Sequence, residues 1–195
     1  MEIIYYYAKE EDALGINYVS AYSWKETYSD LLPKEYLDQR INTYKEKTER
    51  TKTFLKNYNG KYYVAKDSDK VVGIRAFQDS KEDKYRDYGH IEALYVLKEY
   101  QGQGIGKRLF EIAVSELKNM GYQKVELECM SGNDTINFYK KYTGNISSQI
   151  DYPIPGVGTV KADIVLFENI DEILELLNKK RVKWKIIKRI KHIEN

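Results

Sequence analysis

Residues 91–106 read Ile91-Glu92-Ala93-Leu94-Tyr95-Val96-Leu97-Lys98-Glu99-Tyr100-Gln101-Gly102-Gln103-Gly104-Ile105-Gly106. The beginning of this stretch is rich in β-branched, aliphatic and aromatic side chains, which predicts a strand. Its end alternates glycine with other residues, which predicts a loop. The next segment has apolar residues at spacings of three and four, which predicts a helix; they are Ile105, Leu109, Ile112, Ala113, Leu117 and Met120. The unit is therefore a strand, a glycine loop and the N-terminus of a helix.

This order of elements is suited to binding a phosphate. The first backbone N–H groups of a helix have no partner within the helix, and the helix dipole places partial positive charge there. Glycines allow the main chain to approach a ligand closely and to adopt positive φ. A phosphate or pyrophosphate is the expected ligand, and Lys107 in the first turn of the helix is placed to add a phosphate contact.

Two common phosphate-binding patterns do not fit the loop. The P-loop needs a glycine five residues before the Gly-Lys pair and a Ser or Thr after it, but Gln101 and Arg108 occupy those positions. The dinucleotide-binding pattern needs G-x-G-x-x-G, but its last glycine would fall on Lys107 or Leu109. An ordinary glycine-rich connection between a strand and a helix is the other alternative.

The segment Gln101-Gly102-Gln103-Gly104-Ile105-Gly106 fits Gln/Arg-x-x-Gly-x-Gly/Ala. With the strand before it and the amphipathic helix after it, it resembles the acetyl-coenzyme-A pyrophosphate loop of the GNAT superfamily of N-acetyltransferases. The resemblance covers about Ile3 to Phe167. It implies a GNAT-like α/β (α+β) fold, in which a mixed, mostly antiparallel, twisted sheet is flanked by helices.

The order of predicted elements agrees with that fold. We expect one domain over residues 1–168, followed by a helical, basic extension over 169–195. Within the domain we expect a charged loop at 78–88 and a half-buried strand at 125–129. The other expected strands lie at 3–7, 62–66, 71–77, 91–96, 146–152 and 159–167, and the helices at 12–28, 33–41, 43–58, 105–120, 135–141 and from 169.

Composition limits the classes of function. The chain has 195 residues and a net charge of +2, so no general attraction to nucleic acid is implied. Its single cysteine, Cys129, excludes an internal disulfide framework and suits a reducing compartment, so we expect a cytoplasmic protein. The beginning of the chain does not have the pattern of a signal peptide, and no apolar run approaches the roughly 20 residues of a membrane-spanning helix.

The resemblance implies that acetyl-CoA or coenzyme A binds between the Ile91–Val96 and Val125–Cys129 strands. Backbone groups of Leu94 and Val96 would pair with the pantetheine arm, and the N–H of Val96 would polarise the thioester oxygen as an oxyanion-hole donor does. The residues implied for coenzyme binding are Leu94, Val96, Gln101, Gly102, Gln103, Gly104, Ile105, Gly106, Lys107 and Asn133.

Tyr139 is the candidate general acid. Residues 133–144 resemble the family segment Asn-x-x-Ala-x-x-Phe-Tyr-x-x-x-Gly, in which the tyrosine donates a proton to the departing thiolate. A phenol is a reasonable proton donor for that step. The alternative for Tyr139 is an ordinary packed aromatic ring, in a chain that contains 19 tyrosines.

The resemblance makes Glu92 the candidate base, because it precedes Leu94 by two residues on the strand where carboxylates serve as bases in some GNAT enzymes. Burial would raise the pKa of such a carboxyl toward neutrality, which suits proton transfer. The alternative for Glu92 is a solvated charge on the strand. Glu126 and Glu128 alternate along the neighbouring strand, where they either attract a cationic substrate or lie on a solvated face. We expect no metal site, since His90 and His192 are few and isolated, and we expect Cys129 to be a core residue.

The predicted function is transfer of an acetyl group from acetyl-CoA to a primary amine of a small molecule or peptide. Direct attack in a ternary complex is expected, because no activated nucleophile is visible. The alternative is a non-catalytic coenzyme-A-binding regulatory or interaction module. The acceptor stays open, with Trp24, Tyr28 and Tyr152 as candidates for an aromatic rim around it. A homodimer is possible, and no nucleic-acid or membrane partner is expected.

The C-terminal residues have their own pattern. Residues 169–195 contain eight Lys or Arg and four Asp or Glu, a local balance of +4. On a helix, Val182, Ile186, Ile190 and Ile193 would form one apolar stripe among cations. The pattern favours docking on the domain or on a second copy; an interfacial membrane helix is one alternative. The alternation of Val182, Trp184 and Ile186 also permits an added edge strand. Deletion of residues 181–195 separates docking from membrane binding, since docking predicts lost stability or a changed oligomer.

Overall fold

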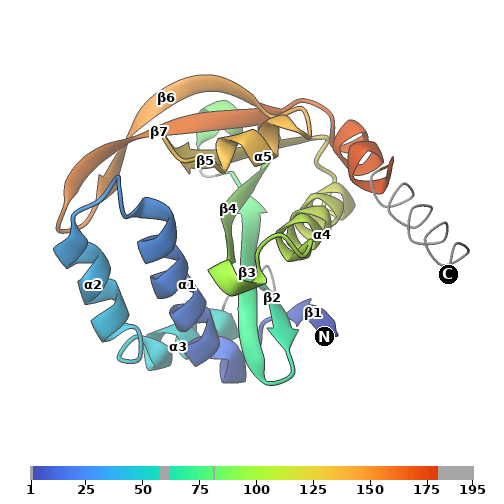
Figure 1. The fold of residues 1–195 in the computed structure, drawn as a ribbon. Helices are drawn as coiled ribbons and strands as arrows, with labels where there is room; N and C mark the ends of the chain where they lie inside the picture. The colour runs from blue at the N-terminus through green and yellow to red at the C-terminus, as the bar shows by residue number, and fades with distance from the viewer. Residues whose placement is uncertain (1, 58–61, 81, 180–195) are drawn as a thin grey trace, which may run out of the picture.

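The computed structural model describes residues 2–57, 62–80 and 82–179, so the predicted apolar stripe of the C-terminal tail lies outside the described residues. The α-helices are α1 (Ala13–Tyr28), α2 (Lys34–Thr43), α3 (Thr48–Asn57), α4 (Ile105–Asn119) and α5 (Ile136–Lys140), with a further helix over 170–179. The strands are β1 (Ile3–Tyr7), β2 (Tyr62–Asp67), β3 (Lys70–Asp79), β4 (Tyr88–Val96), β5 (Lys124–Met130), β6 (Asn145–Ile154) and β7 (Gly158–Phe167) (Figure 1).

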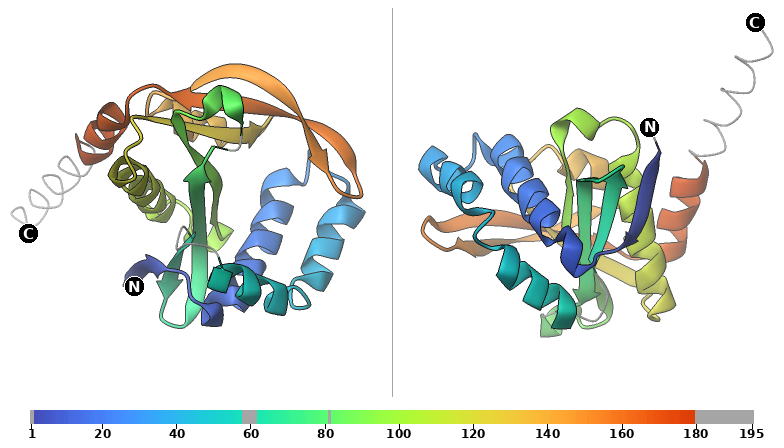
Figure 2. Two further views of the ribbon diagram at one scale, coloured as in Figure 1. Left: turned by 180° about the vertical axis from the view of Figure 1, so that it is seen from behind. Right: turned by 90° about the horizontal axis from the view of Figure 1, so that it is seen from below.

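The strands form one seven-stranded sheet in the order β1-β2-β3-β4-β5-β7-β6. All neighbouring strands are antiparallel except β4 and β5, which are parallel. The predicted mixed, mostly antiparallel sheet with flanking helices is therefore confirmed. The long β6–β7 hairpin arches over one end of the molecule, and α1 and α4 lie on opposite sides of the central strands (Figures 1 and 2).

Apolar side chains on both faces of the central strands explain this layering. On one face, Ile16 and Val19 of α1 pack with Val64 and Ile74 of the β2–β3 hairpin. On the other face, the amphipathic helix α4 buries its apolar stripe against the same strands, with Leu109 completely buried. The hairpin is thus covered on both sides, and its burial fixes the position of β4 beside it.

The beginning of the C-terminal extension belongs to the domain core. The helix over 170–179 places Ile170, Ile173 and Leu177 in the same cluster as Phe110 and Phe167, and all three are at most 1% exposed. Asn169 accepts hydrogen bonds from the backbone N–H groups of the first turn, as an N-cap residue does. In the structure, the described part of the predicted extension docks on its own domain.

Several expected elements differ from those observed. The charged loop is shorter than expected, because Gln78 and Asp79 extend β3 and Tyr88 begins β4. The polar helix expected over 43–58 is shorter, since turns lie between α2 and α3. Strand β5 is almost fully buried rather than half-buried, because β4 and β7 cover it on both edges and the helices cover its face.

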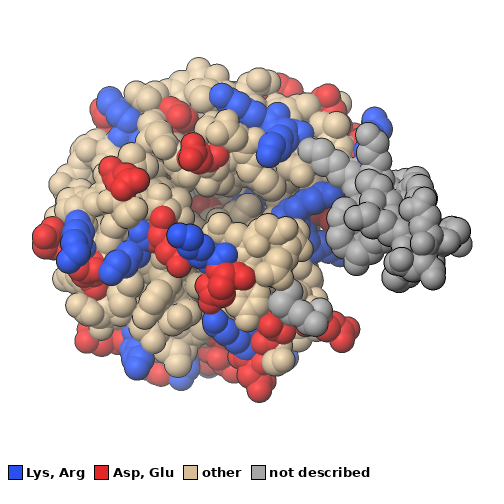
Figure 3. All heavy atoms as spheres, viewed as in Figure 1, with Lys and Arg blue, Asp and Glu red and all other residues tan. Residues whose placement is uncertain are grey.

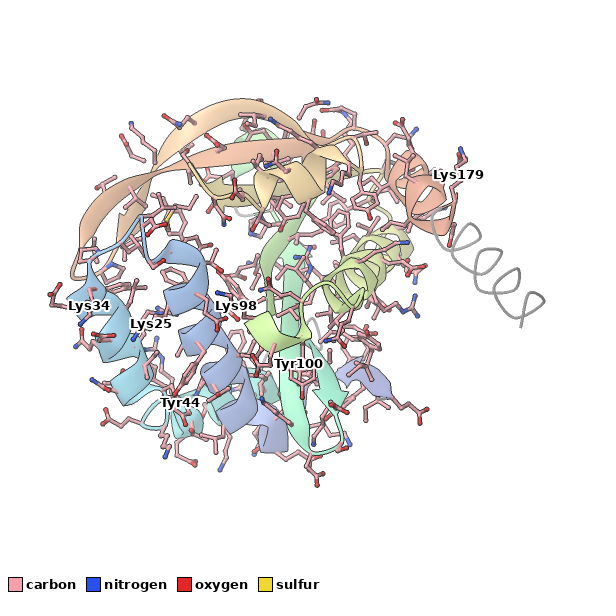
Figure 4. The ribbon with its side chains drawn as sticks, in the orientation of Figure 1. Lys25, Lys34, Tyr44, Lys98, Tyr100 and Lys179 are labelled. Atoms are coloured by element: carbon pink, nitrogen blue, oxygen red, sulfur yellow. The ribbon has the colours of Figure 1, made fainter. Side chains whose placement is uncertain are left out.

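One surface ion pair joins α1 to α2 and a second lies within α2, and both of their lysines are labelled in Figure 4. Lys25 Nζ lies 2.6 Å from one oxygen of Asp38, and Lys34 Nζ lies 3.2 Å from the other. These two contacts hold the pKa of Asp38 below its usual value through hydrogen bonds from the lysines. Among the described residues, no helix is both long and apolar enough to cross a membrane.

Candidate active site

A bulge in β4 opens the sheet. Ala76 pairs with Ala93, and the next residue of β3, Phe77, pairs with Ile91, so Glu92 is the extra residue of β4. The parallel register between β4 and β5 runs only from Tyr88 to Ile91 on the β4 side. The second half of β4 therefore has β3 on one edge and no strand of the described residues on the other.

The free edge presents backbone groups of Leu94 and Val96. Leu97 N donates to Val72 O across the β3 edge at 3.0 Å. Because alternate residues of a strand direct their backbone groups to opposite edges, Leu94 and Val96 direct theirs to the free edge. In the described part of the chain, the main chain of these two residues is therefore open on that edge except at Val96 O, which accepts a hydrogen bond from Gln101 Nε2, and their contact with the pantetheine arm stays a prediction.

The glycine loop has the conformation that its sequence predicted. Gly102 and Gly104 have φ of 73° and 87°, a region that favours glycine. Gly104 is the N-cap of α4. A Cβ atom added at either glycine would meet no other atom within 4 Å, so the space above the loop is open. The first N–H groups of α4 therefore face a space that can receive an anion.

Side chains around the loop hold its shape. Gln101 Nε2 donates to Val96 O at 2.9 Å and Gln103 Nε2 donates to Glu99 O at 3.1 Å. Tyr100, labelled in Figure 4 on the turn between β4 and α4, donates through its hydroxyl to Asp67 at 3.2 Å. The loop is therefore tied to both β4 and the end of β2.

Two further residues at the loop, Ile105 and Lys107, differ in which of their groups can contact a ligand. Ile105 is only 2% exposed, so its side chain belongs to the core and its main chain alone can face a ligand. Lys107 Nζ donates to Leu177 O at 2.7 Å, which ties α4 to the C-terminal helix. Lys107 also lines the cavity beside the loop.

A cavity of about 360 Å³, here called the loop cavity, extends from the glycine loop along β4. Its lining residues are Ser23, Thr27, Leu94, Tyr95, Val96, Gln101, Gly102, Gly104, Gly106, Lys107, Thr135 and Phe138. Figure 3 shows a hollow in this part of the surface, between α1 and α4, with basic side chains on the α4 side. The loop cavity therefore combines the open space above the glycines with the N-terminus of α4, two features that suit a pyrophosphate.

A smaller cavity of about 60 Å³, here called the central cavity, lies where β4 and β5 diverge. It shares Leu94, Tyr95, Thr27 and Thr135 with the loop cavity. It also brings together Glu92, Tyr139 and Asn133, residues that the sequence predicted for catalysis and coenzyme binding.

Tyr139 is buried, at 6% exposure, and its ring packs edge-on against Phe110 at 5.8 Å between centroids. Burial raises the pKa of Tyr139 to about 12, while the positive charge of Arg75 acts in the opposite direction. At neutral pH the phenol therefore holds its proton. Asn133 uses its side-chain oxygen to accept a hydrogen bond from Thr135 N at 2.9 Å, which shapes the turn before α5.

Glu92 is exposed rather than buried, contrary to the expectation that burial tunes it. As the extra residue of the bulge, Glu92 does not follow the alternation of buried and outward-facing side chains along β4. Gln78 Nε2 donates to its carboxylate at 2.7 Å. Glu92 also lines two further cavities, so the central cavity and these two cavities meet at this residue.

The first of these, the acidic cavity, has a volume of about 230 Å³ and is lined by Glu82, His90, Glu92, Glu126, Glu128 and Tyr152. Glu126 is 3% exposed, so it is not on a solvated face. Its carboxylate accepts a hydrogen bond from Ser80 Oγ at 2.9 Å and lies 2.7 Å from Nδ1 of His90.

Sequence reasoning missed this buried His90–Glu126 pair, because it treated His90 as isolated. The two residues lie on neighbouring strands in direct register. Pairing the two predicted strands would have been the signal that brings them together.

The second further cavity, about 60 Å³, contains the predicted aromatic rim. Trp24, Tyr28 and Tyr152 line it together with Glu92 and Glu128. Trp24 and Tyr28 are in edge contact, with ring centroids 5.0 Å apart. The structure therefore brings the three aromatic candidates and Glu92 to the wall of one cavity.

Cys129 lines the central cavity, and burial raises the pKa of its thiol to about 11. A thiol with a raised pKa is protonated at neutral pH and is a weak nucleophile. Within the described residues, no group of three or more His, Cys, Asp or Glu side chains is arranged to hold a metal ion.

The solved structures that this chain resembles share its fold. PaiA N-acetyltransferase from Thermoplasma acidophilum, in complex with coenzyme A, superposes with a TM-score of 0.68 at 20% identity, covering 86% of this chain and 99% of that one. The NatC complex bound to Gag peptide and coenzyme A contains a chain with a TM-score of 0.61 at 21% identity, covering 86% of this chain and 99% of that one.

Sequence relatives carry names of the same class. The uncharacterized N-acetyltransferase YuaI of Bacillus subtilis is 28% identical over 150 residues, which cover 77% of this chain and 84% of that protein. N-alpha-acetyltransferase 30 of Schizosaccharomyces pombe is 34% identical over 83 residues, 40% of this chain and 53% of that protein. The family model described as Acetyltransferase (GNAT) family matches residues 22–144. The chain therefore belongs to the GNAT family of acetyl-CoA-dependent acetyltransferases.

Proposed function

We propose that this protein transfers an acetyl group from acetyl-CoA to a primary amine, by direct attack of the amine in a ternary complex. The observation that carries the proposal is the continuity of three cavities. The loop cavity shares Leu94 and Tyr95 with the central cavity, and the central cavity shares Glu92 and Glu128 with the acidic cavity. One end suits an anionic coenzyme, and the other end suits a cationic amine.

Residues of this chain fit the coenzyme. The N–H groups at the start of α4 and the open space above Gly102 and Gly104 suit its pyrophosphate. The free backbone edge at Leu94 and Val96 suits the amide groups of its pantetheine arm, which would add to β4 as another strand does. Acetyl-CoA supplies the acetyl group as a reactive thioester.

We assign the two proton transfers of the reaction to two side chains, Glu92 and Tyr139. A free alkylamine is mostly protonated at neutral pH, because its pKa is about 10. We assign Glu92, at the junction of the cavities, to accept a proton from the amine, directly or through water. We assign Tyr139 to donate a proton to the departing thiolate, and its raised pKa keeps that proton available at neutral pH.

The charge of the acidic cavity supports a cationic acceptor. Glu82, Glu92, Glu126 and Glu128 surround it, and Tyr152 adds an aromatic wall. Two of the similar proteins carry names that point to amines of polypeptides, an N-alpha-acetyltransferase and the NatC complex with a peptide. A small polyamine and a peptide N-terminus are both primary amines that this cavity could attract.

A screen of amines tests the proposal. Release of free thiol from acetyl-CoA is measured with polyamines, amino acids, peptides and aminoglycosides as acceptors. We expect steady thiol release with at least one amine, matched by an equal amount of acetylated product in mass spectrometry. Coenzyme binding without turnover on any amine would contradict the proposal. A cytoplasmic location and a homodimer remain part of the proposal, the first supported by the single unpaired cysteine.

A further inference from the structure

Arg75 of β3 is completely buried, at 0% exposure. Its Nη1 donates to Ala93 O at 3.1 Å, which ties the guanidinium to the residue that follows the bulge of β4. Its Nε and Nη2 have no hydrogen-bond partner among the described residues. No Asp or Glu in the described part of the chain forms an ion pair with it.

A buried cation without a carboxylate partner is unfavourable, and proteins normally pair or neutralise such a group. Burial lowers the pKa of Arg75 to about 10, so the guanidinium still carries its charge at neutral pH. The fold therefore keeps a positive charge at this position. A charge of this kind is useful in an enzyme when a negative charge forms beside it during the reaction.

The surroundings of Arg75 identify where that negative charge forms. Arg75 and Tyr139 both line the central cavity. Both also pack against Phe110, with the Arg75 Cζ atom 5.7 Å and the Tyr139 ring centre 5.8 Å from the centre of the Phe110 ring. Tyr139 is the side chain whose interaction favours the charged form of Arg75.

Nε and Nη2 of Arg75 have no hydrogen-bond partner among the described residues, yet the Tyr139 hydroxyl is near enough to favour the charged guanidinium. The central cavity is about 60 Å³, roughly the share of two waters in liquid water, so there is room for a bridging water.

We propose that Arg75 is a positioning residue for Tyr139: its guanidinium stabilises the phenolate that remains when Tyr139 has given its proton to the departing thiolate. This inference rests on the proposed function, in which Tyr139 is the acid. It adds a role for the unpaired N–H groups of Arg75, which are placed to donate to the phenolate oxygen directly or through a water.

The proton balance is complete. The C–N bond to the amine forms, the C–S bond breaks, and the electron pair leaves on sulfur. The sulfur takes the proton of the Tyr139 hydroxyl, so a phenolate appears beside Arg75. The proton that the amine nitrogen loses goes to Glu92 or to water and returns through solvent to Tyr139. The net products are the acetylated amine and the thiol form of coenzyme A.

A double-mutant cycle tests the coupling between the two residues. Arg75→Met removes the charge and keeps an unbranched chain. We expect it to lower kcat about tenfold or more when Tyr139 is present, with little change in KM for acetyl-CoA. In a Tyr139→Phe background no phenolate forms, so we expect Arg75→Met to have no further effect. Equal losses in both backgrounds would overturn the proposal, because a purely structural role costs the same in each.

Two variants control for folding and for charge. Arg75→Lys keeps a cation and should retain more activity than Arg75→Met. Arg50→Met removes a guanidinium from the exposed face of α3 and should change neither kcat nor KM. Thermal melting of each variant shows whether it is folded; if Arg75→Met does not fold, the comparison of Arg75→Lys in the two backgrounds replaces it.

A titration tests the inference without any acceptor. A fluorinated tyrosine placed at position 139 has a lower phenol pKa than tyrosine itself, and its ionisation can be followed by fluorine NMR. We expect Arg75→Met to raise this pKa by about one unit or more, because the phenolate loses a neighbouring cation. An unchanged pKa would overturn the role of Arg75. This readout separates the two claims, since it is independent of whether any amine is acetylated.

Discussion

Ile91 of β4 lies opposite Leu127 of β5, and this is the last residue pair of the parallel register between the two strands. The next residue, Glu92, is the extra residue of the bulge, so β4 turns away from β5 at this point. The divergence creates the central cavity and leaves the backbone of Leu94 and Val96 without a neighbouring strand. One irregularity in the sheet thus produces both a coenzyme edge and a catalytic cavity.

Replacing Tyr139 by Phe removes only the hydroxyl. We expect kcat to fall about a hundredfold or more, because general acid catalysis typically contributes that much, and we expect coenzyme affinity to change little. Burial raises the pKa of Tyr139 to about 12, so the acid form is present below that pH and is lost only as the pH rises through it. The wild-type rate should therefore show no alkaline decline from Tyr139 up to about pH 11. Unchanged turnover in the variant would reduce Tyr139 to a packing residue.

Replacing Glu92 by Gln should lower kcat and remove the acidic limb of the pH–rate profile, if Glu92 accepts the proton of the amine. Glu128→Gln is the matched control, because Glu128 lines the same cavities. That control should keep the acidic limb and should raise KM for a cationic acceptor. Identical pH–rate profiles for wild type and Glu92→Gln would remove Glu92 from the mechanism.

Cys129 tests the direct mechanism against an acetyl-enzyme route. Burial raises the pKa of its thiol to about 11, so the thiol is protonated and weakly nucleophilic at pH 7 to 8. We expect Cys129→Ala to keep most of the turnover. Mass spectrometry of wild-type protein mixed with acetyl-CoA and no acceptor should show no acetylated enzyme. A stable or burst-phase acetyl adduct on Cys129 would instead indicate a two-step mechanism.

The helix over 170–179 should contribute to the stability of the whole domain. Ile173 is 0% exposed, and Ile173→Ala leaves a cavity in the core it shares with Phe110. We expect a loss of about 2–5 kcal/mol in the free energy of unfolding, measured with denaturant. The exposed neighbour Glu175 supplies the control, since Glu175→Ala should change stability by less than about 0.5 kcal/mol. Similar melting of both variants would place the helix outside the cooperative core.

Local sequence patterns were sufficient for the elements that hold the site. Strand β4, the glycine loop and α4 were predicted because strand composition, glycine spacing and helical periodicity are properties of neighbouring residues. Of the residues proposed for catalysis, Glu92 and Tyr139 share one cavity in the structure.

The missed features depend on contacts between distant segments. Arg75 lies in an apolar strand, and its burial arises only when α4 and α5 bring Phe110 and Tyr139 over it. The alternation of β5 left Glu126 as either a substrate-attracting or a solvated charge, whereas His90 and Ser80 from other segments contact its buried carboxylate. The bulge at Glu92 is set by the register of β3 against β4, which one strand alone does not reveal.

Coenzyme binding to the glycine loop is the claim on which the proposed mechanism depends, and calorimetry of coenzyme A with two glycine variants tests it. Gly104 and Gly121 both have positive φ, 87° and 99°, and an added Cβ would meet no atom within 4 Å at either position. Gly104→Val and Gly121→Val therefore carry similar backbone strain, about 1–2 kcal/mol each.

Only Gly104 lies on the proposed pyrophosphate site, since Gly121 follows α4 at its other end. The account predicts wild-type affinity for Gly121→Val and no measurable binding for Gly104→Val. A folded Gly104→Val protein that binds coenzyme A as tightly as the wild type would contradict it.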